Sequence, residues 1–291
     1  MSQKRDLFTV LRDARRHDTS WAVAETGTRN VVTYRTLYTR SCNAAAALLN
    51  RGVRRGDRIA VILRNRSEVM ELHFAAAAVH AIIVNVNIHL AGPEMGHQLR
   101  DSNPRLIFAE PEFRNTIREA TSSEKPTALN EIVWIRSTGQ MDRQWIEGVE
   151  QTGYEEWTEV ENGEEIVERH LGEMEGVHDE EDVMHMYYTS GTTGRAKGAT
   201  LSHRIVYLHA QAAVQGTDLK NAVDEWPRRL ICFRNEFRCC RHMGAFLADV
   251  SLGGCLWGLF LDDGWRKARH SPDVHSSRCS ESNRCASNWI S

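Results

Sequence analysis

The residues best suited to chemistry lie within residues 189–198, which combine small, hydroxyl-bearing and positively charged side chains. The segment contains Thr189, Ser190, Gly191, Thr192, Thr193, Gly194, Lys197 and Gly198. Glycine adopts backbone conformations that are closed to other residues, so several amide N–H groups can turn toward one anion. The hydroxyl groups add neutral donors, and the lysine adds a flexible positive charge. This combination predicts a loop that binds a polyphosphate.

One known phosphate-binding motif with a similar composition is the P-loop, G-x-x-x-x-G-K-[ST]. Gly191 and Lys197 have the required separation. However, Ala196 stands where the second glycine belongs, and Gly198 replaces the Ser or Thr that would hold magnesium. Because two of the four fixed positions are missing, a conventional P-loop NTPase is the weaker alternative.

Residues 187–199, YYTSGTTGRAKGA, closely resemble the phosphate-binding signature of the adenylate-forming enzymes. This superfamily comprises acyl-CoA synthetases, luciferases and peptide-synthetase adenylation domains. The resemblance continues through the Leu-Ser-His triplet at residues 201–203. Residues 33–37, 45–48, 56–61 and 85–90 resemble further sequence blocks of the family, although the family more often has Arg where His89 stands. Together these segments extend the resemblance over residues 20–220.

The resemblance implies a two-step reaction that uses ATP, Mg²⁺ and coenzyme A. A carboxylate, expected to belong to a fatty acid, attacks the α-phosphate of ATP and forms an acyl-adenylate and pyrophosphate. A thiol, usually that of CoA, then displaces AMP to form a thioester. An aryl acid is the alternative substrate. No catalytic residue is predicted.

The same resemblance implies roles for the loop residues. The residues expected at the β- and γ-phosphates are Thr189, Ser190, Gly191, Thr192, Thr193 and Gly194. Lys197 is expected to stabilise developing charge. Magnesium would bind mainly through the phosphates, so no protein ligand to a metal is predicted.

The elements that must hold this loop are those of an α/β fold. A strand is predicted at residues 183–188, directly before the loop. Upstream, the pattern predicts helices at residues 33–50, 68–80, 93–100 and 111–120, and strands at residues 58–63, 81–86, 105–109 and 132–135. Gly52 is the predicted stop of the first helix, and Ser67 is the predicted N-cap of the second. This alternation indicates mostly parallel sheets flanked by helices, resembling a truncated N-terminal domain of adenylate-forming enzymes.

Charge is unevenly distributed in this chain of 291 residues, whose net charge is −3. Residues 150–182 carry 14 acidic residues against one basic residue, Arg169, which leaves +10 on the remainder. No regular ligand spacing occurs among these acids, so the region after Trp145 predicts a solvated helix and a linker rather than a cation site. The overall charge argues against a dedicated nucleic-acid binder, which would be strongly basic.

Two regions are predicted: a partial AMP-binding N-terminal domain over residues 1–225, and a divergent, poorly ordered, cysteine-rich tail over residues 226–291. The tail contains six of the seven cysteines. The family's later motifs, which include a ribose-binding Asp and a catalytic Lys, have no counterpart there. A shifted reading frame would explain this, and translating the coding DNA in its other two frames tests that hypothesis. The isolated chain is therefore expected to be an impaired enzyme, and the alternative is a non-enzymatic remnant that at most binds nucleotide.

Other features bear on location and on metal binding. The first 17 residues lack the apolar core of a secretory signal, and the odd number of cysteines indicates a reducing compartment, so a cytoplasmic location is predicted. The apolar residues 244–261 include Asp249 and four glycines, which favours a buried segment over a transmembrane helix. Without a C-x-x-C pair, Cys239, Cys240 and His242 suggest zinc only weakly. Structural or surface positions are expected for His73, His80, His89 and His97.

Overall fold

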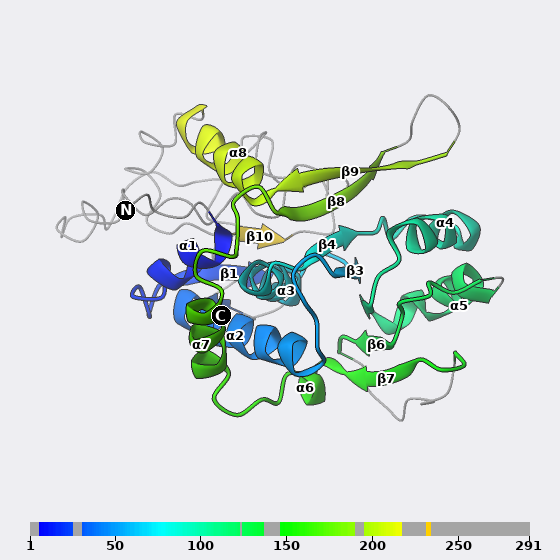
Figure 1. Cartoon of the computed structure of the whole chain (residues 1–291), viewed down its shortest axis with the longest axis horizontal. Helices are drawn as coiled ribbons and strands as arrows, with labels where there is room; N and C mark the ends of the chain where they lie inside the picture. The colour runs from blue at the N-terminus through cyan, green and yellow to red at the C-terminus, as the bar shows by residue number, and fades with distance from the viewer. Residues whose placement is uncertain are drawn as a thin grey trace, which may run out of the picture.

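The computed structural model describes residues 6–25, 31–122, 124–136, 146–189, 195–216 and 231–233. A seven-stranded sheet with the order β7-β6-β5-β3-β4-β8-β9 forms its centre (Figure 1). The strands are β3 (Arg58–Ile62), β4 (Ile82–Asn85), β5 (Leu106–Ala109), β6 (Glu131–Trp134), β7 (Glu150–Gly153), β8 (Val183–Thr189) and β9 (Lys197–Ser202). All neighbouring strands are parallel except β8 and β9, which form an antiparallel hairpin. The mostly parallel sheet predicted from the alternating pattern is thus confirmed.

A second, smaller sheet lies beside the first and has the order β10-β1-β2. Its strands are β1 (Trp21–Glu25), β2 (Val31–Thr33) and β10 (Ile231–Phe233). β1 is antiparallel to β2 and parallel to β10. Apart from β10, the predicted tail at residues 226–291 lies outside the described residues, as do the cysteine cluster and the apolar stretch within it.

The large sheet is covered on both faces, because successive residues of each strand point to opposite sides. In β3, Ile59 and Val61 face one core, whereas Ala60 and Ile62 face the other. The first core is closed by α1 (Leu7–Ala14), α2 (Tyr34–Asn50), α3 (Ser67–Val79) and α7 (Gly163–Glu173). The second is closed by α4 (Gly92–Ser102) and α5 (Arg114–Ser122), the latter entered through the 3₁₀ turn η1 (Pro111–Phe113). Parallel strands that are buried on both faces need near-continuous apolar sequences, which the central strands β3, β4, β5 and β6 have.

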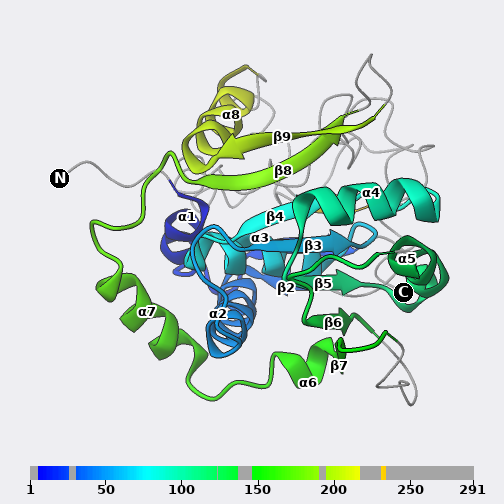
Figure 2. The same cartoon turned by 45° about the vertical axis from the view of Figure 1, so that its right-hand side comes forward.

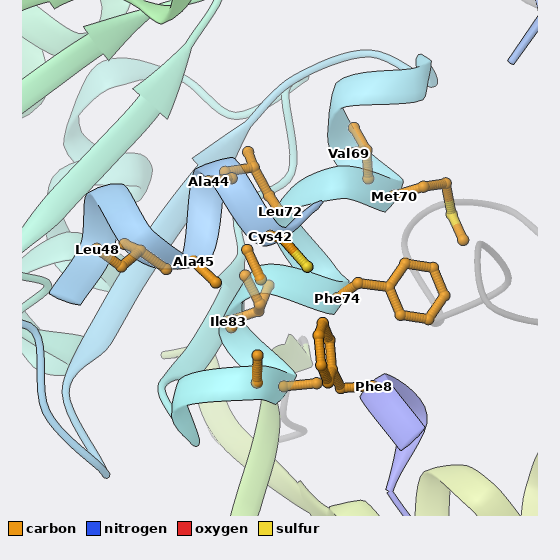
Figure 3. Packing of buried hydrophobic residues seen from close by; sticks show 14 of the residues in the cluster. Phe8, Cys42, Ala44, Ala45, Leu48, Val69, Met70, Leu72, Phe74 and Ile83 are labelled. Atoms are coloured by element: carbon orange, nitrogen blue, oxygen red, sulfur yellow. The ribbon is translucent and has the colours of Figure 1, made fainter. Parts of the chain in front are cut away.

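Helix α3 is the most enclosed helix, since each of its residues is buried. Alanines at residues 44–47 of α2 and 75–78 of α3 are buried together in the first core. Their small side chains let the two helices approach closely, and larger residues such as Phe8, Leu72 and Phe74 fill the remaining space (Figure 3). The polar residues Glu68, Glu71 and His73 of α3 are buried with it, and each has a hydrogen-bond partner, as buried polar groups require.

Most predicted elements agree with the structure to within a few residues, and the cap of one helix differs. The Thr33 hydroxyl accepts a bond from the Thr36 amide at 3.2 Å and begins α2, and Gly52 follows that helix with φ of +69°. The prediction that Ser67 is the N-cap of α3 was wrong, because Ser67 is already helical and the cap position belongs to Arg66. The Ser67 hydroxyl instead donates to the neighbouring Glu68 carboxylate at 3.2 Å.

The acidic region was predicted to contain a solvated helix and a linker; the helix is present as α7, but the linker part was wrong, because the region is folded. It forms β7, the short helix α6 (Tyr154–Trp157) and α7, and β7 extends the parallel sheet beyond β6. Its apolar residues Tyr154, Trp157 and Val167 are buried in the first core, whereas most of its acids point to solvent. Glu164 lies in the first turn of α7 and pairs with Arg35 at 3.1 Å, where a carboxylate also favours the helix dipole. The net charge of the region gave no indication of these few buried apolar residues.

Gly96 allows α4 and α5 to pack closely, which gives a direct test of the second core. A Cβ atom at this position would lie 2.5 Å from the backbone oxygen of Ala120. We expect Gly96→Ala to lower the free energy of unfolding by about 1–3 kcal/mol, because helix backbones must shift to admit the methyl group. The matched control is Gly172→Ala in α7, where a Cβ meets nothing within 4 Å. That change should raise stability by up to about 1 kcal/mol. Urea unfolding measures both effects, and equal values for the two variants would contradict the packing described for Gly96.

Candidate functional site

The predicted phosphate-binding segment connects the two strands of the β8–β9 hairpin. β8 pairs in parallel with β4, so both strands end at the same edge of the sheet. The last parallel pair is Asn85 with Tyr187, and the next two residues, Tyr188 and Thr189, pair with β9. The end of the hairpin therefore extends past the sheet, with α4 beside it (Figure 2). Ligands of open α/β folds bind at this carboxyl edge.

The structure brings together two of the predicted site residues. Thr189 and Lys197 are paired across the hairpin, and both are exposed. Directly paired residues of antiparallel strands project from the same face, with Cβ atoms about 4.5–5.5 Å apart. Among the residues that the structure describes, none forms an ion pair with Lys197. The remaining predicted site residues, Ser190, Gly191, Thr192, Thr193 and Gly194, lie outside the described residues.

Gly198 has a different role from the one expected for a glycine in this segment. It lies within β9 and is not among the described glycines with positive φ, so its backbone is ordinary extended strand. A Cβ atom there would lie 3.2 Å from the Met186 sulfur and 3.4 Å from the Tyr188 ring. Gly198 therefore makes room for two side chains of β8, and the idea that it turns an amide toward a bound anion was wrong.

Two polar residues of α4 contact the hairpin, and the sequence predicted a role for neither. The imidazole Nε2 of His97 lies 3.1 Å from the backbone oxygen of Ala196. The Tyr188 hydroxyl donates to the Asp101 carboxylate at 2.6 Å. Burial of the Tyr188 ring and this bond to Asp101 raise the pKa of the phenol. A spacing of four residues puts His97 and Asp101 on one helix face, but nothing in the local sequence indicates that β8 and β9 are their partners.

The Ser202–His203 pair, which continues the family signature, lies at the far end of the hairpin. The Ser202 hydroxyl accepts a bond from the Ile205 amide at 3.3 Å, at the start of α8 (His203–Gly216). His203 is fully buried and stacks on His80, with ring centroids 4.3 Å apart. The other face of His80 stacks on His178 at 3.7 Å. These three rings form the histidine stack, which packs at the amino edge of the sheet, away from the predicted loop.

Two rings of the histidine stack, those of His80 and His203, have a lowered pKa and are neutral at physiological pH. Burial, followed by the neighbouring His203 and His178, lowers the pKa of His80 to about 3. His80 Nδ1 lies 2.7 Å from Asp182, which also pairs with Arg55. Burial alone would raise the pKa of Asp182, but bonds from Arg55, the Asp179 amide and His80 lower it overall. The stack is therefore a structural device held by a charged carboxylate.

Cations that follow the central strands at the carboxyl edge already have partners. Arg64 and Arg66, which follow β3, both bind Glu110, which follows β5, at 3.0 and 2.9 Å. Arg66 further lies 3.5 Å from Glu68. Because their charges are neutralised by carboxylates, these arginines attract a polyphosphate only weakly. The Lys197 side chain, in contrast, is exposed to solvent.

The donor set of the hairpin fits a nucleotide with a phosphate-bound metal. Hydroxyl and ammonium groups donate hydrogen bonds to phosphate oxygens, and Mg²⁺ at nucleotide sites is usually held by the substrate phosphates together with one or two carboxylates. Within the described part of the chain, no group of His, Cys, Asp or Glu could hold a metal ion. None of the helices in that part is long and apolar enough to cross a membrane.

Comparison with known proteins shows the family to which this chain belongs. The family model of the AMP-binding enzymes matches residues 10–259. The chain therefore belongs to the AMP-binding enzyme family. The match extends past residue 225 into the segment predicted as a divergent tail.

Individual relatives match this chain over only part of their own length. Benzoate–CoA ligase, peroxisomal, from Arabidopsis thaliana is 28% identical over 62% of this chain and 31% of its own length. A fatty acid–[acyl-carrier-protein] ligase from Streptomyces coeruleorubidus is 29% identical over 64% of this chain and 31% of its own length. The chain thus spans about a third of the length of these relatives.

Solved structures agree with the fold. The inhibitor-bound N-terminal domain of FACL13 from Mycobacterium tuberculosis superimposes with a TM-score of 0.56 at 22% identity, over 73% of this chain and 48% of that one. An anthranilate CoA ligase in complex with anthranoyl-AMP gives a TM-score of 0.55 at 24% identity, over 71% of this chain and 36% of that one. At these identities the likeness shows the fold alone.

Proposed function

We propose that this chain is the nucleotide-binding part of an ATP-dependent acyl-CoA synthetase, an acid–thiol ligase. Membership of the AMP-binding family supports the class of reaction. The observation that carries the proposal for this chain is the pairing of Thr189 with the exposed Lys197 at the end of the β8–β9 hairpin. This pair would flank a segment rich in hydroxyl groups and glycine at the carboxyl edge of a parallel sheet.

In the proposed reaction, the chain's own groups bind and orient the triphosphate. Thr189, Ser190, Thr192 and Thr193 donate hydroxyl hydrogen bonds to the β- and γ-phosphates, and Gly191 and Gly194 leave backbone amides free to do the same. Lys197 neutralises charge that develops as pyrophosphate leaves. Magnesium, bound through the phosphates, would supply further charge neutralisation there.

The acid oxygen attacks the α-phosphorus, the bond to the β-phosphate oxygen breaks, and an acyl-adenylate and pyrophosphate form. In the second step the sulfur of CoA attacks the acyl carbon and AMP leaves, which gives the thioester. We propose a fatty acid as the substrate, with an aryl acid as the alternative. The names of the relatives include both chemistries, among them a butyrate–CoA ligase and a benzoate–CoA ligase from Arabidopsis thaliana.

We further propose that the chain as printed is impaired in turnover, with residues 1–225 as the partial AMP-binding domain and residues 226–291 as a divergent tail. The share of the relatives that it spans, about a third, supports this. A non-enzymatic remnant that binds nucleotide is the second candidate. A cytoplasmic location remains a proposal, since several relatives are named as peroxisomal.

Exchange of labelled pyrophosphate into ATP, measured with a panel of fatty and aryl acids, tests the proposed function. Exchange that depends on the acid supports adenylation and identifies the acid class. ATP binding without exchange supports the remnant. Steady ATP hydrolysis without any acid favours a P-loop type of NTPase and overturns the proposal.

A further inference from the structure

Both strands of the hairpin are held by one face of α4. His97 and Asp101, four residues apart, contact the backbone of Ala196 and the side chain of Tyr188 respectively. Ala196 directly precedes Lys197, and Tyr188 directly precedes Thr189. Each contact therefore fixes a residue next to one member of the exposed Thr189–Lys197 pair.

The chemistry of the groups in these two contacts defines which atom donates each hydrogen bond. A backbone carbonyl only accepts, so the His97 Nε2 carries the hydrogen that reaches Ala196. The Tyr188 hydroxyl donates to a carboxylate, and such charge-assisted bonds are shorter and stronger than bonds between neutral groups. The bond length of 2.6 Å agrees with this. Tyr188 and Met186 also pack against the second core, so the contact lies at the margin of the protein interior.

Helix α4 is itself firmly anchored, which is what a support requires. Met95 and Leu99 are fully buried in the second core, and Gly96 packs against the backbone of α5. His97 and Asp101 project from the side of this anchored helix that meets the hairpin. A binding group held in place by a rigid neighbour loses less conformational entropy when its ligand arrives.

We propose that His97 and Asp101 are positioning residues for polyphosphate binding, which hold Thr189 and Lys197 in register through Ala196 and Tyr188. This inference rests on the proposed function, in which the pair binds the phosphates of ATP. It assigns a function to α4 that involves no contact with the nucleotide.

The test compares variants that remove each bond with variants that keep it. Tyr188→Phe and His97→Ala should each raise the Kd for ATP, measured by titration calorimetry, by about 3–10-fold. Asp101→Asn keeps an acceptor oxygen but removes the charge, and it should stay within about twofold of the unaltered chain. His97→Gln keeps a donor and should recover part of the affinity. Hydrogen exchange of peptides covering residues 183–189 and 195–202 is measured in parallel without nucleotide, and it should be faster only in the bond-removing variants.

The outcomes separate this inference from the proposed function. Unchanged ATP affinity in both Tyr188→Phe and His97→Ala would overturn the positioning role. If the unaltered chain binds no ATP, the proposed function fails, and hydrogen exchange alone decides the contacts. In that case faster exchange in the bond-removing variants supports positioning of the pair by α4, whereas unchanged exchange overturns it. The positioning role would also be overturned if Asp101→Asn, which keeps the hydrogen bond, lowered both the thermal midpoint and the ATP affinity. A general loss of stability would then explain the weaker ATP binding of the variants.

Discussion

Lowering the pH from 8 to 5 is expected to remove about 4 kcal/mol of folding stability through two buried histidines, His73 and His80. Burial lowers the pKa of His73 to about 4, and burial together with the adjacent histidines lowers that of His80 to about 3. An unfolded histidine has a pKa near 6.5. At pH 5 each therefore contributes about 2 kcal/mol in favour of the unfolded state.

The direction follows from which state binds the proton. Well above pH 6.5 the two histidines are neutral in both states and contribute nothing to the pH dependence. As the pH falls through 6.5, the two histidines become protonated in the unfolded chain but stay neutral in the folded chain. The free energy of unfolding therefore declines until the pH reaches their folded-state pKa values of about 4 and 3. Burial also lowers the pKa of His185 and of His203, which act in the same direction. The free energy of unfolding of a typical domain is about 5–15 kcal/mol, so a loss of about 4 kcal/mol is large.

Urea unfolding at pH 8 and pH 5 measures this effect in the unaltered chain and in His73→Gln. The His73 Nδ1 lies 2.7 Å from the Val69 carbonyl, and the glutamine amide can donate to the same oxygen. The variant should lose about 2 kcal/mol less than the unaltered chain between the two pH values. His89→Gln, at an exposed position, is the control and should retain the full loss. An equal loss in His73→Gln and the unaltered chain would show that His73 is not held neutral by burial. Glu71, whose pKa burial raises, is the same in each protein and cancels from the comparison.

Replacing Lys197 with Ala is expected to weaken ATP binding by about 10–100-fold while leaving the unliganded fold intact. A hydrogen bond to a charged group contributes about 1.5–3 kcal/mol, which converts to that range of affinity. Lys197 is exposed, so its removal opens no cavity. Titration calorimetry gives the affinity, and thermal unfolding without ATP gives the stability.

Arg169→Ala is the matched control, because it removes one positive charge from the exposed surface of α7. It should leave both ATP affinity and stability close to those of the unaltered chain. Equal affinity in Lys197→Ala and the unaltered chain would contradict the proposed role of Lys197. A comparable drop in both variants would indicate that only net charge attracts the nucleotide.

Most of the helices and strands could be predicted from local patterns, because the central strands β3 to β6 are short apolar runs between helical segments, whereas the polar strand β7 has no such pattern. The prediction failed where a few apolar residues were hidden among acids. Tyr154 and Trp157 anchor the acidic region in the first core, although its net charge indicated a linker. The cap of α3 also differed by one residue, since local sequence favours Ser67 but the structure places it, buried, as the first helical residue.

The sequence alone determined the class of this protein and the chemistry of its loop, because hydroxyl groups, glycines and a lysine within ten residues are a local property. Only the tertiary structure decided what supports that chemistry. Asp101 and Tyr188 are 87 residues apart, and His97 and Ala196 are 99 apart. They meet because α4 packs beside the strand that pairs with β4, and strand order depends on how every helix covers the sheet. The same holds for the histidine stack, whose members come from three separate segments, and for the lowered pKa of His80 and His203, which arises from burial that no local pattern records.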